Sequence, residues 1–136
     1  MEGSLAIDDV PDAWNDAVER LIGLPVPSDA EGVLQDTHWG GGLIGYFPTY
    51  TIGNLMAAQL WEMLRTDLPE VDAQIERGDF APLRTWLREH VHVHGRKLPP
   101  PELLARVTGQ ELAVAPFLRY LRAKLADAGV LTAAPR

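Results

Sequence analysis

The chain has 136 residues, 46% of them hydrophobic, and contains no cysteine. This is enough for one domain with a hydrophobic core, so we expect residues 1–136 to form a single domain with a flexible lead-in over residues 1–8. The formal net charge of −7 argues against nucleic acid and anionic membranes as partners, because both require a basic surface. The lack of cysteine excludes disulfides and thiolate chemistry, and with no signal-peptide or membrane-span pattern we expect a cytoplasmic location.

Hydrophobic residues recur with helical spacing in several segments, and no useful stretch alternates with a period of two. The sequence therefore predicts an all-α fold of about five or six helices, held together by burial of their apolar stripes. The first helix should have Asp9 as its cap, Pro11 in its first turn and Gly23 at its end. Residues 24–30 should form an extended linker.

The strongest predicted helix follows Pro48, where apolar residues return to helical spacing between Ile52 and Leu64. Later helices are expected over residues 69–75, 82–94, 102–107 and 116–128, most of them opened by a proline and closed by a glycine. In the last helix we expect five residues to face inward: Phe117, Leu118, Leu121, Leu125 and Ala128.

A glycine-rich stretch from Gly32 to Gly53 lies between the first two helices. Its 22 residues contain six glycines and the polar and aromatic residues Asp36, His38, Trp39, Tyr46 and Tyr50. Glycine lets backbone approach a ligand closely, and such side chains on non-helical backbone often form active-site walls. A tight structural crossover between two helices would have a similar composition.

The segment Gly32-Val33-Leu34-Gln35-Asp36-Thr37-His38-Trp39 resembles the G-x-x-Q-D-x-H-W signature of the carboxypeptidase Taq family, also called thermostable carboxypeptidase 1. Later segments are similar to the same family: Gly45 to Tyr50, Gly53 to Leu55, His92 to Gly95, Leu103-Leu104 and Thr108-Gly109. The resemblance extends from about Asp12 to about Leu131 and so covers nearly the whole chain.

This resemblance implies a metal-dependent enzyme that removes C-terminal amino acids from peptides. Family members are several times longer, and their H-E-x-x-H helix supplies two histidine ligands and a general-base glutamate, with a carboxylate ligand from a later helix. This chain has no H-E-x-x-H, so it resembles only the C-terminal portion of a larger helical, zincin-like metallopeptidase. We expect the chain alone to hold no metal and to be inactive.

For the complete enzyme, the resemblance implies zinc or cobalt and a metal-bound water, polarised by the glutamate, that attacks the last peptide bond. The implied partners are the C-terminus of a peptide substrate, the missing N-terminal catalytic part and a second copy in a homodimer. This chain would supply cleft-wall residues that stabilise the oxyanion and hold the end of the substrate.

Three residues are expected to serve catalysis. His38 would donate a hydrogen bond to a substrate carbonyl or carboxylate, and Asp36 would fix its orientation. Tyr46 would donate its hydroxyl to the developing oxyanion. The alternatives are an aspartate that caps backbone N–H groups, a histidine bonded to the loop and a packed tyrosine.

Further residues are expected to bind substrate: Gln35, Trp39, Tyr50, His94 and Arg96. Gln35 would orient the catalytic pair, whereas packing at a helix start is the alternative for Tyr50. Arg96 and its neighbour Lys97 are cations suited to a terminal carboxylate, but basic residues beside a helix end also complement its dipole.

His90 and His94 are four residues apart, so one helical turn would bring them together around a metal. We expect core histidines instead, because they lie on an apolar face and no glutamate stands between them. Gly40 and Leu43-Ile44 differ from the serine and aromatic residues expected in many family members, so substrate specificity does not transfer across them.

A second function fits the same sequence, namely a stand-alone, non-catalytic helical module that binds a peptide terminus or a protein partner. If the rest of an enzyme is absent, we expect apolar surface that normally meets it to be exposed. Such surface would favour self-association.

Overall fold

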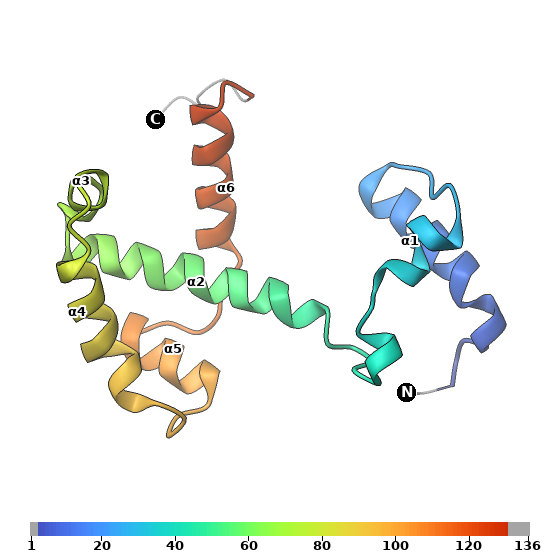
Figure 1. The fold of residues 1–136 in the computed structure, drawn as a ribbon, viewed down its shortest axis with the longest axis horizontal. Coiled ribbons are helices and arrows are strands. Elements are labelled where there is room, and N and C mark those ends of the chain that lie inside the picture. Colours follow the sequence, from blue (N-terminus) through green and yellow to red (C-terminus); the bar gives the residue numbers. More distant parts are fainter. Residues whose placement is uncertain (1–2, 131–136) are drawn as a thin grey trace. The chain divides into compact units, whose positions relative to one another are not determined.

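The structure, a computed structural model, describes residues 3–130, and within them every regular element is helical (Figure 1). The α-helices of this part of the chain are α1 (Val10–Ile22), α2 (Pro48–Asp67), α3 (Val71–Glu76), α4 (Ala81–His90), α5 (Pro100–Thr108) and α6 (Ala115–Asp127). Short 3-10 helices accompany them: η1 (Ile7–Asp9), η2 (Asp29–Glu31), η3 (Val33–Gln35), η4 (Trp39–Gly41) and η5 (His92–His94). The predicted all-α fold is confirmed, and one predicted helix end, that of α4, is wrong.

The chain forms two compact units that divide after Pro48. The first unit holds α1 and most of the glycine-rich stretch, and the second holds the helices from α2 to α6. Among the helices of residues 3–130, none combines the length and the hydrophobicity that crossing a membrane requires.

Helix α1 forms where the sequence predicts it. Pro11 lies in its first turn, and Gly23 ends it with a φ of 78°, a left-handed conformation that suits glycine. Asp9 is at the cap position but makes no side-chain cap hydrogen bond, because η1 already gives it helical backbone angles. Ile7 and Asp8 belong to η1, so the predicted lead-in is partly regular; residues 1–2 lie outside the described part of the chain.

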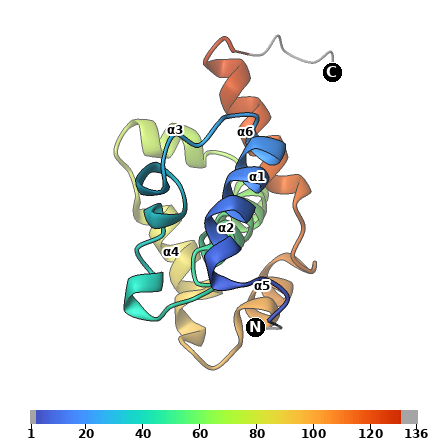
Figure 2. The same cartoon turned by 90° about the vertical axis from the view of Figure 1, so that its right-hand side faces the viewer.

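Three buried side chains form the centre of the second unit: Leu64 of α2, Val71 of α3 and Trp86 of α4. Partly buried hydrophobic residues surround them, namely Leu60, Trp61, Met63, Leu68, Ile75, Leu83, Leu87, Val91 and Val107. The Trp86 indole N–H donates to the Asp67 carboxylate at 2.7 Å, so the polar atom of this core residue is paired. In Figures 1 and 2, α3 and α4 accordingly lie beside the C-terminal half of α2.

A buried amide attaches the loop before α6 to α2. Gln59 is only 3% exposed; its Nε2 donates to the Glu111 carbonyl at 2.9 Å, and its Oε1 accepts from the Ala113 N–H at 3.1 Å. Both ends of the amide are therefore satisfied, which is what allows a polar side chain in the core. Gln59 thus ties the loop between α5 and α6 to α2.

The predicted helix over residues 82–94 is wrong in its last turn, because α4 ends at His90 and residues 92–94 form η5. The His90 ring Nδ1 lies 2.9 Å from the Trp86 carbonyl, and Val91 has a φ of −118° that leaves the helical path. A β-branched residue such as Val91 also loses rotamer freedom in a helix. His90 and His94 therefore do not share a helical turn.

Helix α6 matches its predicted bounds but not its predicted burial. Phe117 and Leu121 are half-buried, whereas Leu118 and Leu125 are 42% and 40% exposed. Ala128 lies beyond the helix and is exposed. The face predicted to point inward is therefore open along part of its length.

Candidate functional site

Asp36 and His38, the first pair predicted for the site, are hydrogen-bonded to each other in the first unit. Asp36 Oδ1 accepts from the backbone N–H of His38 at 3.0 Å and lies 2.7 Å from the Nδ1 atom of the same residue. The Asp36 side chain is 6% exposed and the His38 side chain 22% exposed. Because a carboxylate only accepts, Nδ1 is the donor in this pair, and Nε2 is directed away from Asp36.

Glycine-rich backbone holds His38 in place. The His38 carbonyl accepts from the N–H groups of Gly41 at 3.0 Å and Leu43 at 2.9 Å. This tight turn passes through Gly42, whose φ of 76° is a left-handed conformation that other residues rarely adopt. The turn that follows the histidine therefore favours glycine at position 42.

Two aromatic rings lie beside the imidazole of His38. The Tyr46 ring centroid is 5.0 Å away, with 34° between the ring planes, and the Phe47 centroid is 6.1 Å away. The structure thus brings together the three residues predicted for catalysis, including Asp36. Phe47 was not predicted, and the pair of aromatic residues after Gly45 is the sequence signal that points to it.

Gly32, the first residue of the signature segment, occupies a position with no room for a side chain. A Cβ atom there would lie 2.5 Å from Val26 Cγ1 and 3.1 Å from the Ser28 carbonyl oxygen. Its neighbour Val33 is 5% exposed in η3, which packs against α1. This glycine therefore serves the packing of the segment that carries Asp36.

The other two signature residues predicted to bind substrate make contacts within the first unit. Trp39 packs edge-on against Trp14 of α1, with ring centroids 6.1 Å apart. The Gln35 side-chain amide donates to the Ala30 carbonyl and so stabilises the loop before η3. A substrate-binding role for either residue stays a prediction.

The remaining predicted site residues, Tyr50, His94 and Arg96, belong to the second unit. Tyr50 lies in the first turn of α2 and is 53% exposed. His94 is half-buried at the end of η5, and Arg96 is exposed beyond it. Their roles in binding substrate also stay predictions.

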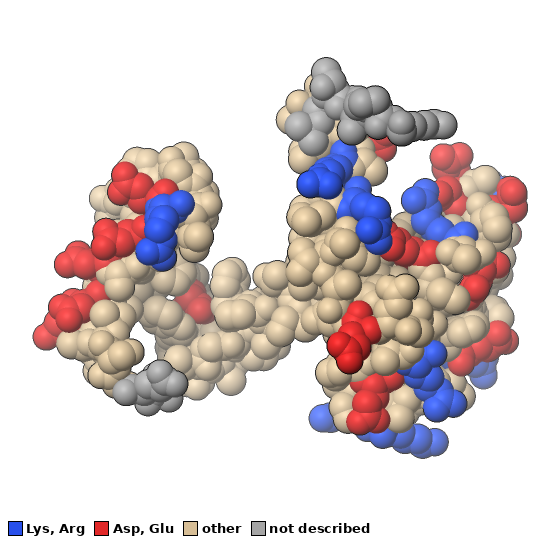
Figure 3. Space-filling view, turned by 180° about the vertical axis from the view of Figure 1, so that it is seen from behind, with Lys and Arg blue, Asp and Glu red and all other residues tan. Residues whose placement is uncertain are grey.

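Acidic side chains dominate the first unit (Figure 3). Residues 3–48 contain eight Asp and Glu residues, and Arg20 is the only Lys or Arg among them. Such a surface disfavours an anionic substrate terminus. Of the Asp36–His38 pair, only the imidazole can donate a hydrogen bond to an anionic oxygen, because the carboxylate only accepts.

The described residues do not form a metal centre. Within residues 3–130, no three His, Cys, Asp or Glu side chains lie together where they could hold a metal ion. The His90 ring stacks on Trp86 with centroids 4.6 Å apart, and its Nδ1 contacts the Trp86 carbonyl, so this histidine is part of the core. These residues do not fit the zinc or cobalt ion that the resemblance implies for the complete enzyme.

Solved structures of metallocarboxypeptidases share this fold. The M32 carboxypeptidase from Deinococcus radiodurans R1 matches with a TM-score of 0.85 and 47% sequence identity, over 92% of this chain and 25% of that one. Metallocarboxypeptidase 1 of Trypanosoma cruzi matches with a TM-score of 0.83 and 38% identity, over 90% of this chain and 25% of that one. The fold is therefore that of one part of a helical metallocarboxypeptidase.

Carboxypeptidase 1 of Bacillus subtilis is 43% identical over 123 residues, which are 90% of this chain. The chain spans 25% of the length of that relative. The family described as Carboxypeptidase Taq (M32) metallopeptidase matches residues 1–125. The chain thus belongs to the carboxypeptidase Taq family, which confirms the resemblance of the segment from Gly32 to Trp39.

Proposed function

We propose that this chain is the C-terminal part of a metal-dependent carboxypeptidase, and that it positions the substrate while the rest of the enzyme holds the metal. The observation that carries the proposal is the Asp36–His38 pair, held beside Tyr46 in a member of a metallopeptidase family. Relatives named as carboxypeptidases align with most of the chain, and it accounts for about a quarter of their length. The metal ligands and the general base would belong to the other three quarters.

In this proposal His38 binds the oxygen that becomes negative when the last peptide bond is attacked. Its Nδ1 donates to Asp36, and when Nε2 also carries a proton the ring presents Nε2–H as a donor to a substrate oxygen. Asp36 is a positioning residue, since it acts on the substrate only through the ring of His38. The side chain of His38 is 22% exposed, which leaves part of the ring accessible.

Tyr46 would add a second donor at the same place. Tyr46 is 43% exposed and its ring lies 5.0 Å from that of His38, which supports a shared role of the two residues at the substrate. Donors fixed before the reaction stabilise a developing oxyanion because they need no reorganisation when charge appears. We assign substrate binding to the remaining predicted residues: Gln35, Trp39, Tyr50, His94 and Arg96.

The proposal is tested with the chain alone and with a chimera. The 136-residue chain, supplied with zinc or cobalt, should release no amino acid from an unblocked peptide. A chimera in which this chain replaces the matching quarter of Bacillus subtilis carboxypeptidase 1 should release C-terminal amino acids. His38→Gln should lower the kcat of the chimera by about 10²–10³-fold, the usual effect of removing one oxyanion donor. Thr37→Ala, at the exposed position between the paired residues, is the matched control.

Two results would contradict the proposal. Metal-dependent release by the chain alone would show that it contains a complete site. A folded, metal-loaded chimera that releases nothing would favour the second function, a non-catalytic helical module that binds a peptide terminus or a protein.

A further inference from the structure

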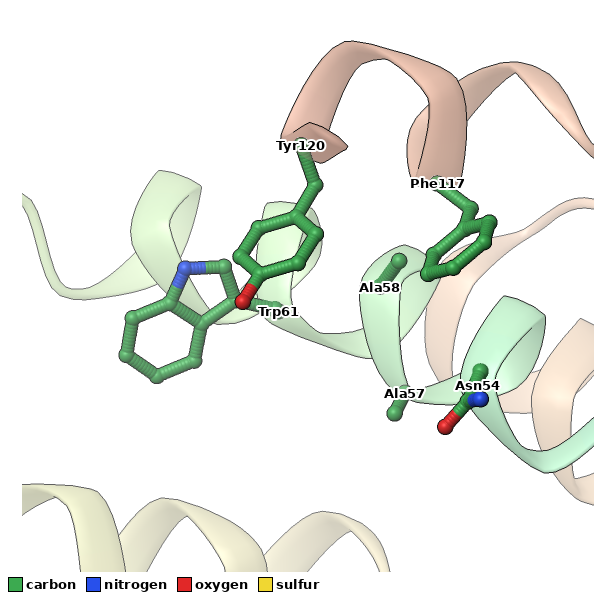
Figure 4. A pocket seen from close by; sticks show the side chains of 6 residues that line it. All are labelled: Asn54, Ala57, Ala58, Trp61, Phe117 and Tyr120. Atoms are coloured by element: carbon green, nitrogen blue, oxygen red, sulfur yellow. The ribbon is translucent and has the colours of Figure 1, made fainter. Parts of the chain in front are cut away.

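An apolar groove lies between α2 and α6 in the second unit (Figure 4). Its volume is about 470 Å³, and it is lined from α2 by Asn54, Ala57, Ala58 and Trp61 and from α6 by Phe117 and Tyr120. None of these lining residues belongs to the predicted substrate site. The groove therefore needs an explanation of its own.

The groove has the form of a surface on which a helix docks. Residues 54, 57, 58 and 61 have the spacing i, i+3, i+4 and i+7, so one face of α2 forms the floor. Ala57 and Ala58 keep that floor low, while the rings of Trp61, Phe117 and Tyr120 stand around it (Figure 4). An amphipathic helix binds such a groove through apolar residues at the same spacing.

Two basic side chains next to Tyr120 on α6 make contacts within the unit. Arg119 of α6 donates two hydrogen bonds to the Glu62 carboxylate of α2, each 2.8 Å long. The Lys124 ammonium donates to the Tyr120 hydroxyl at 3.3 Å and lies over the same ring. The groove thus offers a partner aromatic and methyl surface, which favours apolar side chains over a charged ligand.

The length of the relatives indicates which kind of partner occupies the groove. The chain covers 25% of Bacillus subtilis carboxypeptidase 1, so three quarters of that fold lie outside it. Among residues 3–130, twenty large hydrophobic side chains are at least 40% exposed, and Leu118, Tyr120 and Leu125 of α6 are among them. Apolar surface that is contiguous with a groove, as on α6, marks an interaction site.

We infer that the groove between α2 and α6 is the docking surface for an amphipathic helix from the metal-binding part of a carboxypeptidase Taq enzyme. This inference rests on the proposed function, since it takes the chain to work together with that part. Docking there would bury the aromatic walls and the alanine floor in the interior of the assembled enzyme. Through this groove, the chain contacts the metal-binding part of the enzyme.

The test variant is Ala57→Arg, because Ala57 lines the groove and is exposed in the chain alone. In the isolated chain, this variant should leave the melting temperature unchanged. In the chimera with Bacillus subtilis carboxypeptidase 1, it should lower the melting temperature and reduce activity by about tenfold or more, as expected for a blocked interface centre. Ala73→Arg changes an exposed alanine of α3 outside the groove and should have no effect on either property.

The outcomes separate this inference from the proposed function. Equal melting temperature and activity of the Ala57→Arg and Ala73→Arg chimeras would overturn the inference and leave the function standing. A folded, inactive parent chimera would overturn the function, while a lower melting temperature of its Ala57→Arg variant would still support the groove. A dimer of the isolated chain that Ala57→Arg dissociates would assign the groove to a second copy and overturn the inference.

Discussion

One carboxylate oxygen of Asp36 contacts His38 twice, at the backbone N–H (3.0 Å) and at the ring Nδ1 (2.7 Å). The two contacts tie the imidazole to its own backbone and restrict rotation of the side chain. Because the carboxylate can only accept, they also keep a proton on Nδ1. Asp36, two residues earlier in the chain, therefore helps to fix the orientation of the ring and keeps Nδ1 protonated.

Replacing Asp36 should separate these two effects. Asp36→Ala removes the acceptor, so the NMR signal of the Nδ1-bound proton of His38 should disappear in the isolated chain. In the chimera, kcat should fall by about 10–100-fold, as it does when the partner of a functional histidine is removed. Asp36→Asn keeps an acceptor oxygen without the charge, so the proton signal should persist while kcat still falls. Loss of the signal with an unchanged kcat would refute the positioning role.

Gly32→Ala should destabilise the isolated chain by about 1–3 kcal/mol, the usual cost of overpacking. The new Cβ would lie 2.5 Å from Val26 Cγ1 and would force this part of the first unit to shift. Gly40→Ala is the matched control in the same stretch, because no atom lies within 4 Å of its Cβ position. Urea unfolding followed by tryptophan fluorescence measures both variants. Partial rescue of Gly32→Ala by Val26→Ala would confirm the clash, and equal stability of the two glycine variants would contradict it.

The positions of the helices follow from the sequence because proline and glycine mark their ends. Pro11 and Gly23 bound α1 in this way, and Gly109 closes α5 with a φ of 71°. The early end of α4 could not be predicted, since the apolar period continues past His90. At that end the His90 ring contacts the Trp86 carbonyl, a side-chain contact that periodicity does not report.

The candidate site also combines contacts that the sequence predicts with contacts that it does not predict. The pairing of Asp36 with His38 is local, so the spacing in the sequence already suggests it. The position of Phe47 near His38 depends on the turns at Gly42 and Gly45, both with positive φ, and composition alone does not fix how such turns fold. Local pairs were therefore predictable, whereas contacts across the glycine-rich turns required the structure.

Gln59→Leu should destabilise the chain by about 2 kcal/mol or more, because it leaves the Glu111 carbonyl and the Ala113 N–H without their partner. Gln110→Leu, an exposed glutamine in the same loop, should change stability by less than about 0.5 kcal/mol. Urea unfolding measures both, and hydrogen exchange at the Ala113 amide should accelerate only in Gln59→Leu. Unchanged exchange at that amide would show that the loop is held by something else.

The ion pair between Glu62 and Arg119 should make stability depend on pH. Hydrogen bonds from Arg119 lower the pKa of Glu62 from its ordinary value of 4.5, partial burial opposes this shift, and the attraction between the charges adds to it. A pKa lowered on folding gives stability that is present above 4.5 and is lost as the pH falls through the folded value. Both side chains are largely exposed, so the effect is small.

Arg119→Met should therefore be slightly less stable than the parent chain at neutral pH, and the difference should shrink below a pH of about 4.5 and vanish once Glu62 is protonated in the folded chain. Arg122→Met, on the same helix, should show no such change with pH. Thermal unfolding over a series of pH values measures the three proteins. A stability difference that stays constant at all pH values would mean that Arg119 acts through packing and not through its charge.

The isolated chain should bind no stoichiometric zinc or cobalt. Residues 3–130 present no three ligand side chains together, and a protein site for zinc normally needs at least three. His90 is held against Trp86 by stacking and by its Nδ1, and it lies in α4 while His94 lies in η5, so the pair cannot chelate from one helical face. Metal analysis after dialysis against cobalt, together with the visible absorption of the bound ion, measures this directly. A stoichiometric cobalt ion that is lost in His94→Ala would show that the histidines form a site, and the assignment of the metal to the rest of the enzyme would then be wrong.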